Sequence, residues 1–329
     1  MHCLCTTLKW SRTGRSFWLA LAGLTVCYVP ASTTLANAAP PSPVWHLATA
    51  NAAFPARESH SSLVFGEKMW VIGGNTNAGL AGDVWSSRDG QHWLPATTQA
   101  AFTARANHVS VVFDNRMWVI GGNDGSNKND VWSSTDGTHW VQVTARAGFS
   151  PRQNHSALVF NDRMWVIGGN DGSNKNDIWS SSDGVNWTPV VHSADFSPRQ
   201  NHASVVFENR LWVTGGHDGG YRNDIWSSTD GAVWTKVVNS ADFSRRFAHT
   251  LEVFNNKMFV INGNDVDSRN DVWFSSNGLR WAETSTRRIN KYPDRYSQSS
   301  LVFNKKLWVI GGVDTTSIQK NDVWWFDEK

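Results

Sequence analysis

Short apolar runs rich in valine, isoleucine and tryptophan recur along the chain, and polar turns separate them. One such unit begins with the β-branched run 108–113, crosses an Asp-Asn turn and returns as the apolar run 117–122. This pattern is typical of a tight β-hairpin. A polar loop of seven to nine residues leads to a third run, 130–134, and an Asp-Gly turn leads to a fourth around Trp140. We therefore expect four strands in each unit and no helix beyond the first 38 residues.

The unit is repeated. Arg116–Trp140 returns almost letter for letter as Arg163–Trp187. Weaker copies begin at Met69, Leu211, Met258 and Leu307. One histidine recurs at intervals of 48, 47, 47 and 47 residues, as His60, His108, His155, His202 and His249, and Gln298 takes its place in the sixth copy. Six such units predict an all-β fold, a six-bladed β-propeller with four-stranded antiparallel blades.

The two ends of the repeat region fit together. In four copies, 12 residues separate the tryptophan of the fourth strand from the arginine that precedes the next unit, and the same interval separates Trp45 from Arg57. Trp45 is therefore interpreted as the last strand of a unit whose earlier strands lie at the other end, around Asp322-Val323-Trp324. We expect the N-terminal strand to complete the last blade, which closes the ring and removes its open edges.

The first 38 residues do not share this pattern. They carry a basic start, an apolar run over 17–29 and the small-residue sequence Ala-Asn-Ala at their end. This order is typical of a cleaved secretory signal peptide, and the apolar run is too short for a membrane-spanning helix. We predict a signal peptide over 1–38, a propeller domain over 39–329 and an exported protein, periplasmic or extracellular. A lipoprotein signal that ends at Cys27 is the alternative.

Removal of this leader would change the composition. All three cysteines, Cys3, Cys5 and Cys27, lie within it, so the mature chain would hold no disulfide, no Cys-ligated zinc and no cysteine nucleophile. The remainder carries 27 basic and 28 acidic residues, and this near-neutral balance lacks the basic face that nucleic-acid binding requires. We expect no nucleic-acid partner, no membrane span, no cofactor and no metal.

The repeated residues resemble the Kelch repeat. An arginine precedes strand one, two glycines end strand two, Asp-Val-aromatic opens strand three, and a tryptophan marks strand four. The paired glycines are Gly73-Gly74, Gly121-Gly122, Gly168-Gly169, Gly215-Gly216 and Gly311-Gly312, with Asn262-Gly263 in the fifth copy. The resemblance extends from Trp45 to Trp325. It leaves function open, because Kelch propellers include peptide-binding modules, galactose-oxidase-like copper enzymes and periplasmic sialic-acid mutarotases.

Two sets of repeated residues are interpreted as structural. The strand-two tryptophans are expected to fill the wedge between neighbouring blades: Trp70, Trp118, Trp165, Trp212 and Trp308. With a two-residue turn, positions that sum to 229 face each other, so His108 falls opposite Gly121 and the glycine leaves room for the imidazole. Successive histidines lie one blade apart, so they cannot share one metal ion.

Each repeat also has one arginine and one aspartate. The arginines are Arg57, Arg105, Arg152, Arg199, Arg246 and Arg295, and the aspartates are Asp83, Asp130, Asp177, Asp224, Asp271 and Asp322. The arginine ring suggests an anion-binding site on the face that carries the connections between strands two and three, which we call the longer-looped face. One Arg and one Asp per blade also predicts a repeated ion pair, which we favour. We expect a subset of the arginines to remain accessible to a ligand.

The fifth repeat departs from the others. Glu252 replaces a leucine or valine, and Asn262 replaces the first glycine and faces His249 by the pairing count. A carboxylate at an apolar position is costly unless paired, and its pKa would rise. We expect these three residues to form a polar pocket, with an ion-paired Glu252 of no function as the alternative. Three residues of the fourth-repeat loop would supplement the pocket: His217, Tyr221 and Arg222.

Three classes of function follow. We favour an exported propeller that binds a protein or carbohydrate ligand through its longer-looped face. The second class is a sugar mutarotase or epimerase similar to the periplasmic sialic-acid enzyme, with Glu252 and His249 as catalytic candidates for general acid–base chemistry. The third, a galactose-oxidase-like copper enzyme, is disfavoured, because the resemblance implies a Cys–Tyr cross-link and the mature chain has no cysteine.

Overall fold

The computed structural model describes residues 44–284 and 292–327, so the predicted signal peptide lies outside the described residues. The described residues form strands and turns, with no helix and therefore no helix that could cross a membrane. The strands group into six sheets, each of four antiparallel strands. A short additional strand, β2 (Arg57–Glu58), pairs with one of them. The predicted six-bladed β-propeller is confirmed.

We number the blades one to six by the order of their first strands. The first strands are β3 (Ser61–Phe65), β7 (Val109–Phe113), β11 (Ser156–Phe160), β15 (Ala203–Phe207), β19 (Thr250–Phe254) and β23 (Ser299–Phe303). The second strands are β4 (Lys68–Thr76), β8 (Arg116–Asn123), β12 (Arg163–Asn170), β16 (Arg210–His217), β20 (Lys257–Ile261) and β24 (Lys306–Ile310).

The outer half of each blade contains the third and fourth strands. The third strands are β5 (Gly79–Ser87), β9 (Asn127–Ser134), β13 (Asn174–Ser181), β17 (Tyr221–Ser228), β21 (Val272–Ser275) and β25 (Val323–Asp327). The fourth strands are β6 (Leu94–Thr97), β10 (Val141–Thr144), β14 (Thr188–Val191), β18 (Thr235–Val238), β22 (Ala282–Glu283) and, in blade six, β1 (Val44–Thr49).

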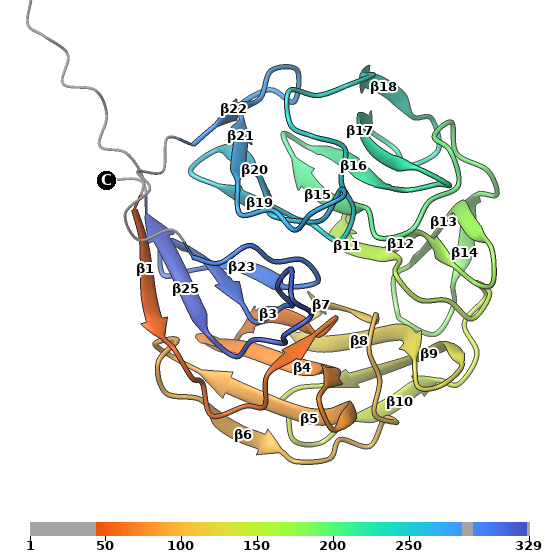
Figure 1. Ribbon diagram of the computed structural model, residues 1–329. Coiled ribbons are helices and arrows are strands. Elements are labelled where there is room, and N and C mark those ends of the chain that lie inside the picture. The colour runs from red at the N-terminus through yellow and green to blue at the C-terminus, as the bar shows by residue number, and fades with distance from the viewer. Residues whose placement is uncertain (1–43, 285–291, 328–329) are drawn as a thin grey trace, which may run out of the picture. The chain divides into compact units, whose positions relative to one another are not determined.

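The ring closes through blade six. Each first strand contacts the first strand of the next blade, and β23 contacts β3. The N-terminal strand β1 pairs antiparallel with β25, and Figure 1 draws β1 in red-orange beside β25 in blue. Trp45 of β1 is buried, with its ring 4.4 Å from that of Tyr292 and 5.1 Å from that of Phe326. The two ends of the described chain therefore share one sheet and one core, as predicted.

The hairpin between strands one and two has the predicted turn and register. Asp114 and Asn115 have φ angles of 46° and 52°, which a type I′ turn requires at both central residues. Phe113 pairs with Arg116 and Val109 pairs with Ile120, so the facing positions sum to 229. The hairpin is thus specified locally, by two residues that tolerate the left-handed conformation.

The predicted loop of seven to nine residues between strands two and three is wrong for blades one to four. In blade two, Gly122 pairs with Lys128 and Asn123 pairs with Asn127, so only 124–126 lie outside the strands. Polar side chains at both strand ends concealed this extension, because they carry no apolar alternation. Blades five and six do have long irregular connections, over 262–271 and 311–322.

Tryptophan and glycine lock neighbouring blades together. Trp118 of blade two is buried in one cluster with Met164 and Val166 of blade three. A Cβ atom on Gly184 of blade three would lie 2.2 Å from the Trp118 ring, so the Asp-Gly turn must carry a glycine. The same contact links Gly90, Gly137, Gly231 and Gly278 to the strand-two tryptophan of the preceding blade. Core packing by these tryptophans follows from this geometry.

The pairing of histidine with glycine differs from the prediction. The Cβ of His108 packs against Gly122, the second glycine of its own blade, where an added Cβ would lie 2.6 Å away. Its imidazole instead crosses to blade one, where Cε1 lies 2.9 Å from a Cβ added to Gly73. The Gly-Gly pairs of blades one to four therefore each accommodate two histidines, one from their own blade and one from the next, and Gly311-Gly312 of blade six accommodates Gln298 and His60. The register was predicted correctly, but the direction of the side chain was not.

Candidate functional site

The six arginines form buried ion pairs. Arg105 is 0% exposed and makes two parallel hydrogen bonds to Asp130, of 2.7 and 2.8 Å. It also donates to the backbone carbonyl of Gly121 at 2.9 Å. The equivalent pairs are Arg57–Asp83, Arg152–Asp177, Arg199–Asp224, Arg246–Asp271 and Arg295–Asp322. Bidentate Arg–carboxylate pairs of this kind are strong and directional.

These ion pairs determine whether the six arginines are available to a ligand. Burial alone would raise the pKa of Asp130, but the hydrogen bonds and charge of Arg105 outweigh it and lower the pKa. All six guanidinium groups are 0% exposed, so none of them faces a ligand on the longer-looped face. The arrangement supports the repeated ion pair, and the expectation that some arginines stay accessible is not met.

The histidine ring is also buried. Four imidazoles have Nε2 within hydrogen-bonding distance of a hydroxyl of the preceding blade: His108 with Ser61, His202 with Ser156, His249 with Thr214 and His60 with Ser299. Burial, and then the charge of the neighbouring arginine, lowers the pKa of each of the five histidines to about 3. They are neutral at physiological pH. Within residues 44–284 and 292–327, no three His, Cys, Asp or Glu side chains group closely enough to hold a metal ion.

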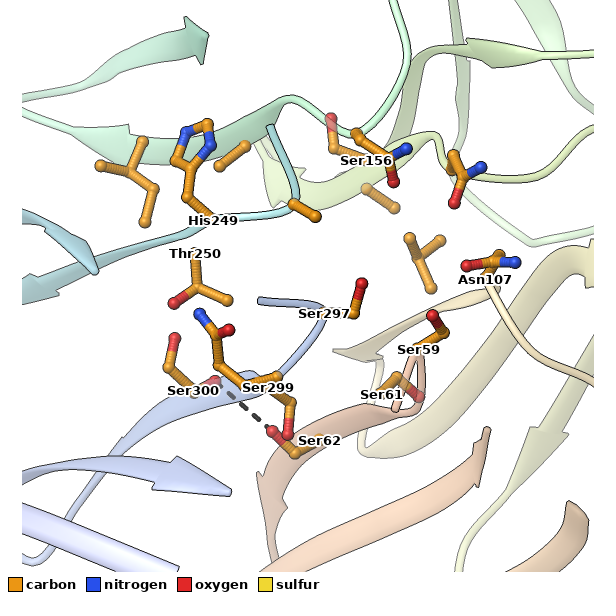
Figure 2. A pocket seen from close by; sticks show the side chains of 18 of the residues that line it. Ser59, Ser61, Ser62, Asn107, Ser156, His249, Thr250, Ser297, Ser299 and Ser300 are labelled. Carbon is orange, nitrogen blue, oxygen red and sulfur yellow. Dashed lines mark hydrogen bonds between the residues drawn. The ribbon is translucent and has the colours of Figure 1, made fainter. Parts of the chain in front are cut away.

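A polar cavity of about 260 Å³ lies along the axis of the ring, lined by the first strands of all six blades. Serine, threonine and asparagine side chains dominate its wall, as Figure 2 shows. The dashed line in Figure 2 marks the 3.4 Å hydrogen bond from the Ser62 hydroxyl to the backbone carbonyl of Ser300. Of the residues that line the cavity, only Glu252 carries a carboxylate.

Glu252 lies at the seam between blades five and six. The hydroxyl of Ser300 donates to its Oε1 at 2.8 Å. Burial raises the pKa of Glu252 to about 7, and the bond from Ser300 only partly offsets that rise. A carboxyl group of this kind exchanges its proton near neutrality, which is the range a general acid or base needs.

The predicted polar pocket is only partly assembled. His249 and Glu252 both line the cavity, but His249 directs Nε2 to the hydroxyl of Thr214. Asn262 is 0% exposed and lies behind the cavity wall, where the hydroxyl of Tyr292 donates to its side-chain oxygen. Its φ of 58° is the left-handed conformation that glycine adopts at this position in the other blades. Asn262 is therefore a buried structural residue.

The other predicted residues lie elsewhere, on the longer-looped face. Tyr221 and Arg222 line a hollow of about 540 Å³ between the loops of blades four and five, together with Arg245 and Val266. Arg222 is paired with Asp218 at 2.7 Å and its side chain remains 46% exposed. The structure thus places His249 and Glu252 at the axial cavity, and Tyr221 and Arg222 at the seam between blades four and five.

Aromatic rings cluster beside this hollow. The rings of Tyr221 and Phe247 are stacked, 5.1 Å apart with an interplanar angle of 20°. His217 lies 5.6 Å from Tyr221, and Tyr296 lies 6.3 Å from Phe247. All four side chains are half-buried. Together they form an aromatic cluster that combines flat apolar faces with polar edges.

Sequence reasoning missed three residues here. Phe247 and Arg245 precede strand one of blade five, and Lys236 lies on β18 beside an adjoining hollow of about 300 Å³ that Arg222 and Arg245 also line. Each departs from its repeated position, where the preceding blade has Gln200, Pro198 and Pro189. The same comparison of repeats that identified Glu252 would have found them.

The family follows from the comparison with known proteins. The model of the KLHDC2/KLHL20/DRC7 Kelch-repeats domain matches residues 40–182, 88–263 and 170–329, which together span the propeller. The chain belongs to the Kelch-repeat family. Among solved structures, this Kelch propeller is similar to the one titled "Structure of YjhT", with 15% sequence identity and a TM-score of 0.68. The match covers 84% of this chain and 96% of the other, and it shows the shared fold. No curated protein matches the sequence.

The buried histidines of the Kelch propeller predict acid sensitivity. A histidine with a pKa of about 3 in the folded state, against its ordinary 6.5, binds its proton only in the unfolded state between these values. The free energy of unfolding should therefore fall as pH drops from about 6.5 toward 3, by up to about 1.4 kcal/mol per pH unit for each histidine. Among the described residues Glu252 acts in the opposite direction, because its raised pKa makes the folded state more stable as pH falls from about 7 to 4.5, and five histidines outweigh this contribution.

Urea unfolding between pH 7 and 4 measures this slope. The substitution His108→Gln, which copies Gln298 of blade six, should reduce it by the contribution of one histidine. A free energy of unfolding that stays constant between pH 7 and 5 would contradict the prediction.

Proposed function

We propose that this chain is an exported ligand-binding Kelch propeller, which binds a protein or carbohydrate at the seam between blades four and five of its longer-looped face. The stacked rings of Tyr221 and Phe247 carry this proposal. Half-exposed aromatic faces bind sugar rings and apolar side chains with large contact area and little loss of side-chain freedom. Tyr221 is the first residue of β17 and Phe247 lies in the connection before β19, and neither ring is part of the core cluster of its blade.

Comparison of the repeats supports this assignment. At the position of Tyr221 the other blades have Leu80, Asn127, Asn174, Ser268 and Gln319. At the position of Phe247 they have Glu58, Ala106, Gln153, Gln200 and Tyr296. The fold is built without aromatic residues there in blades one to three. The aromatic cluster of blades four to six is therefore not required by the propeller and is available for recognition.

Charge at the same seam favours a ligand with polar or anionic groups. Arg222 and Arg245 line both hollows, and Lys236 lies beside the second. Arg222 is paired with Asp218, whereas Arg245 is exposed and forms no ion pair among the described residues. Arginine and tyrosine are the residues that most often dominate the energy of a binding interface. The basic start and apolar run of the first 38 residues support export.

The double substitution Tyr221→Asn with Phe247→Gln tests the proposal. It gives the seam between blades four and five the residues of the seam between blades three and four, Asn174 and Gln200, and so removes the aromatic cluster with side chains that the repeat already uses at these positions. A glycan-binding screen and an affinity capture of exported proteins would identify a ligand of the wild-type chain. The variant should bind that ligand at least tenfold more weakly, because about 1.4 kcal/mol of aromatic contact is lost.

A matched control separates recognition from folding. Leu94→Ser removes an exposed apolar side chain on β6, away from the seam, and should bind as the wild type does. The double variant should also unfold at nearly the wild-type urea concentration, since neither ring is part of a blade core. Wild-type affinity in the double variant would refute this site.

A second candidate function rests on one observation, the carboxyl group of Glu252 in a cavity lined by hydroxyl groups. Its pKa of about 7 suits proton exchange with a sugar hydroxyl, as in a mutarotase. His249 does not assist Glu252, because burial lowers the pKa of the His249 imidazole to about 3 and its Nε2 is hydrogen-bonded to the hydroxyl of Thr214. Glu252 would act with Ser300 alone.

Equilibration of sugar anomers, followed by NMR, tests this second function. The wild-type chain should accelerate the exchange of at least one common sugar, and Glu252→Gln should abolish the acceleration while the aromatic cluster stays intact. Glu58→Gln, on the longer-looped face, is the control and should remain active. If the wild-type chain accelerates anomer exchange for no sugar, the mutarotase function is refuted and ligand binding is the one function that we propose.

A further inference from the structure

The seam between blades five and six differs from the other seams around the cavity. In three seams, a serine at the start of strand one meets the imidazole of the next blade: Ser61 with His108, Ser156 with His202 and Ser299 with His60. At the seam between blades five and six, Thr250 takes the place of the serine and Gln298 takes the place of the histidine. The repeat thus places these two side chains toward each other across the seam.

Two oxygen atoms at this seam have no hydrogen-bond partner. Gln298 is 5% exposed, and its amide nitrogen donates to the backbone carbonyl of Ile261 at 3.2 Å. That bond fixes the orientation of the amide and leaves Oε1 unpaired within the described chain. The hydroxyl oxygen of Thr250 is buried and also unpaired among the described residues. Buried polar atoms of this kind are costly unless a ligand or ion satisfies them.

A carboxylate and a hydroxyl lie next to these atoms. Glu252 follows Thr250 by two positions on β19. Ser300 on β23 follows Gln298, the residue directly before β23, by two positions, so side-chain alternation puts the members of each pair on one side of the chain. The two strands contact each other, and the hydroxyl of Ser300 donates to Glu252 at 2.8 Å. All four side chains line the axial cavity, and Figure 2 shows Thr250 and Ser300 on the same part of its wall.

The four side chains of Thr250, Glu252, Gln298 and Ser300 have the chemistry of a site for a cation of low charge. Its donors are oxygen atoms only, from one carboxyl group, one amide and two hydroxyl groups. The histidines around the cavity are neutral, and the nearby Arg246 is already paired with Asp271. Calcium sites use several carboxylates, whereas a single negative charge with neutral oxygens matches one positive charge.

We propose that Glu252, Thr250, Gln298 and Ser300 form a site for one small monovalent cation, either an inorganic ion or the ammonium group of a small amine, in the cavity wall between blades five and six. The site goes beyond the ligand-binding function proposed for the longer-looped face and does not depend on it. The bound charge stabilises the ionised carboxylate in its desolvated position. It also links blades five and six.

Thermal unfolding of the full chain at pH 8 tests the proposal. Choline chloride, whose quaternary nitrogen is shielded by methyl groups and has no N–H to donate to the four oxygen atoms, is replaced stepwise by NaCl, KCl, NH4Cl or methylammonium chloride at constant ionic strength. At least one of these salts should raise the Tm by a few degrees in a saturable way, because a ligand that binds only the folded state stabilises it. Selectivity for Na+ or K+ would assign an inorganic ion, and a preference for the ammonium compounds would assign an amine.

Two variants localise the effect. Glu252→Gln keeps the shape and the bond to Ser300 but removes the charge, so it should weaken cation binding at least tenfold and abolish the rise in Tm. Thr250→Val keeps the shape of the threonine and removes its oxygen, and it should also weaken binding. Glu58→Gln removes a carboxylate outside the cavity and should keep the full response.

Three results would overturn the proposal. The first is a Tm that does not distinguish the small cations from choline. The second is an undiminished response in Glu252→Gln, or in Thr250→Val should the first variant not fold. The third is a preference for CaCl2 that disappears in Glu252→Gln, which would assign a divalent site instead. Loss of ligand binding in the Tyr221 and Phe247 variant has no bearing on these outcomes, so the two proposals fail separately.

Discussion

The buried pair between arginine and aspartate is the interaction on which each blade of this propeller depends. The arginine lies just before the first strand of a blade. The aspartate lies within the third strand of that blade in blades one to four, and directly before the third strand in blades five and six. Arg152, for example, holds both oxygens of Asp177 and also the backbone carbonyl of Gly168. One side chain thus joins the inter-blade connection, the third strand and the Gly-Gly segment. Because all six guanidinium groups are occupied in this way, recognition must come from residues outside the repeat.

Departures from the repeat fall into two kinds. The first compensates for ring closure. Asn262, Tyr292 and Gln298 replace a glycine, a phenylalanine and a histidine at one seam, and the Tyr292 hydroxyl reaches Asn262. Phe259, which replaces a tryptophan, packs against Phe326, 5.6 Å away. The bond between Tyr292 and Asn262 and the packing of Phe259 on Phe326 belong to the frame.

Departures of the second kind have no compensating partner in the frame. Tyr221, Phe247 and Arg245 gather around one hollow although they come from two blades. Glu252 places a carboxyl group in a cavity that the other blades line with neutral side chains. A residue that lowers the stability of the fold and adds nothing to its packing is expected to serve a function. We assign function to these two places on this ground.

Much of the frame could be predicted from the sequence because its signals are local and repeated. The number of blades follows from the histidine spacing, and the register follows from the two-residue turn at Asp114. The Arg–Asp pairs follow from stoichiometry. The strand extension over 127–129 could not be predicted, because its asparagine and lysine side chains show no apolar alternation.

The candidate site was less predictable, because it depends on side-chain direction across seams. The sequence brought Asn262 and His249 together by register, whereas the structure turns one into the blade and the other toward Thr214. Tyr221 and Phe247 lie on different blades, and no period relates them. The only sequence signal for these two residues is that they differ from the residues at the equivalent positions of most other repeats. That signal does not predict which of the differing residues lie close together in the structure.

The central claim is that the Arg–Asp pair holds the frame, and a double-mutant cycle tests it most directly. Unfolding in urea would be measured for Arg152→Met, Asp177→Ala, the double variant and the wild-type chain. A buried, bidentate pair predicts a coupling free energy of about 2 kcal/mol or more, so that the double variant is much more stable than the sum of the two single costs implies. Single costs that add to within about 0.5 kcal/mol would contradict the account, because the two residues would then stabilise the blade independently.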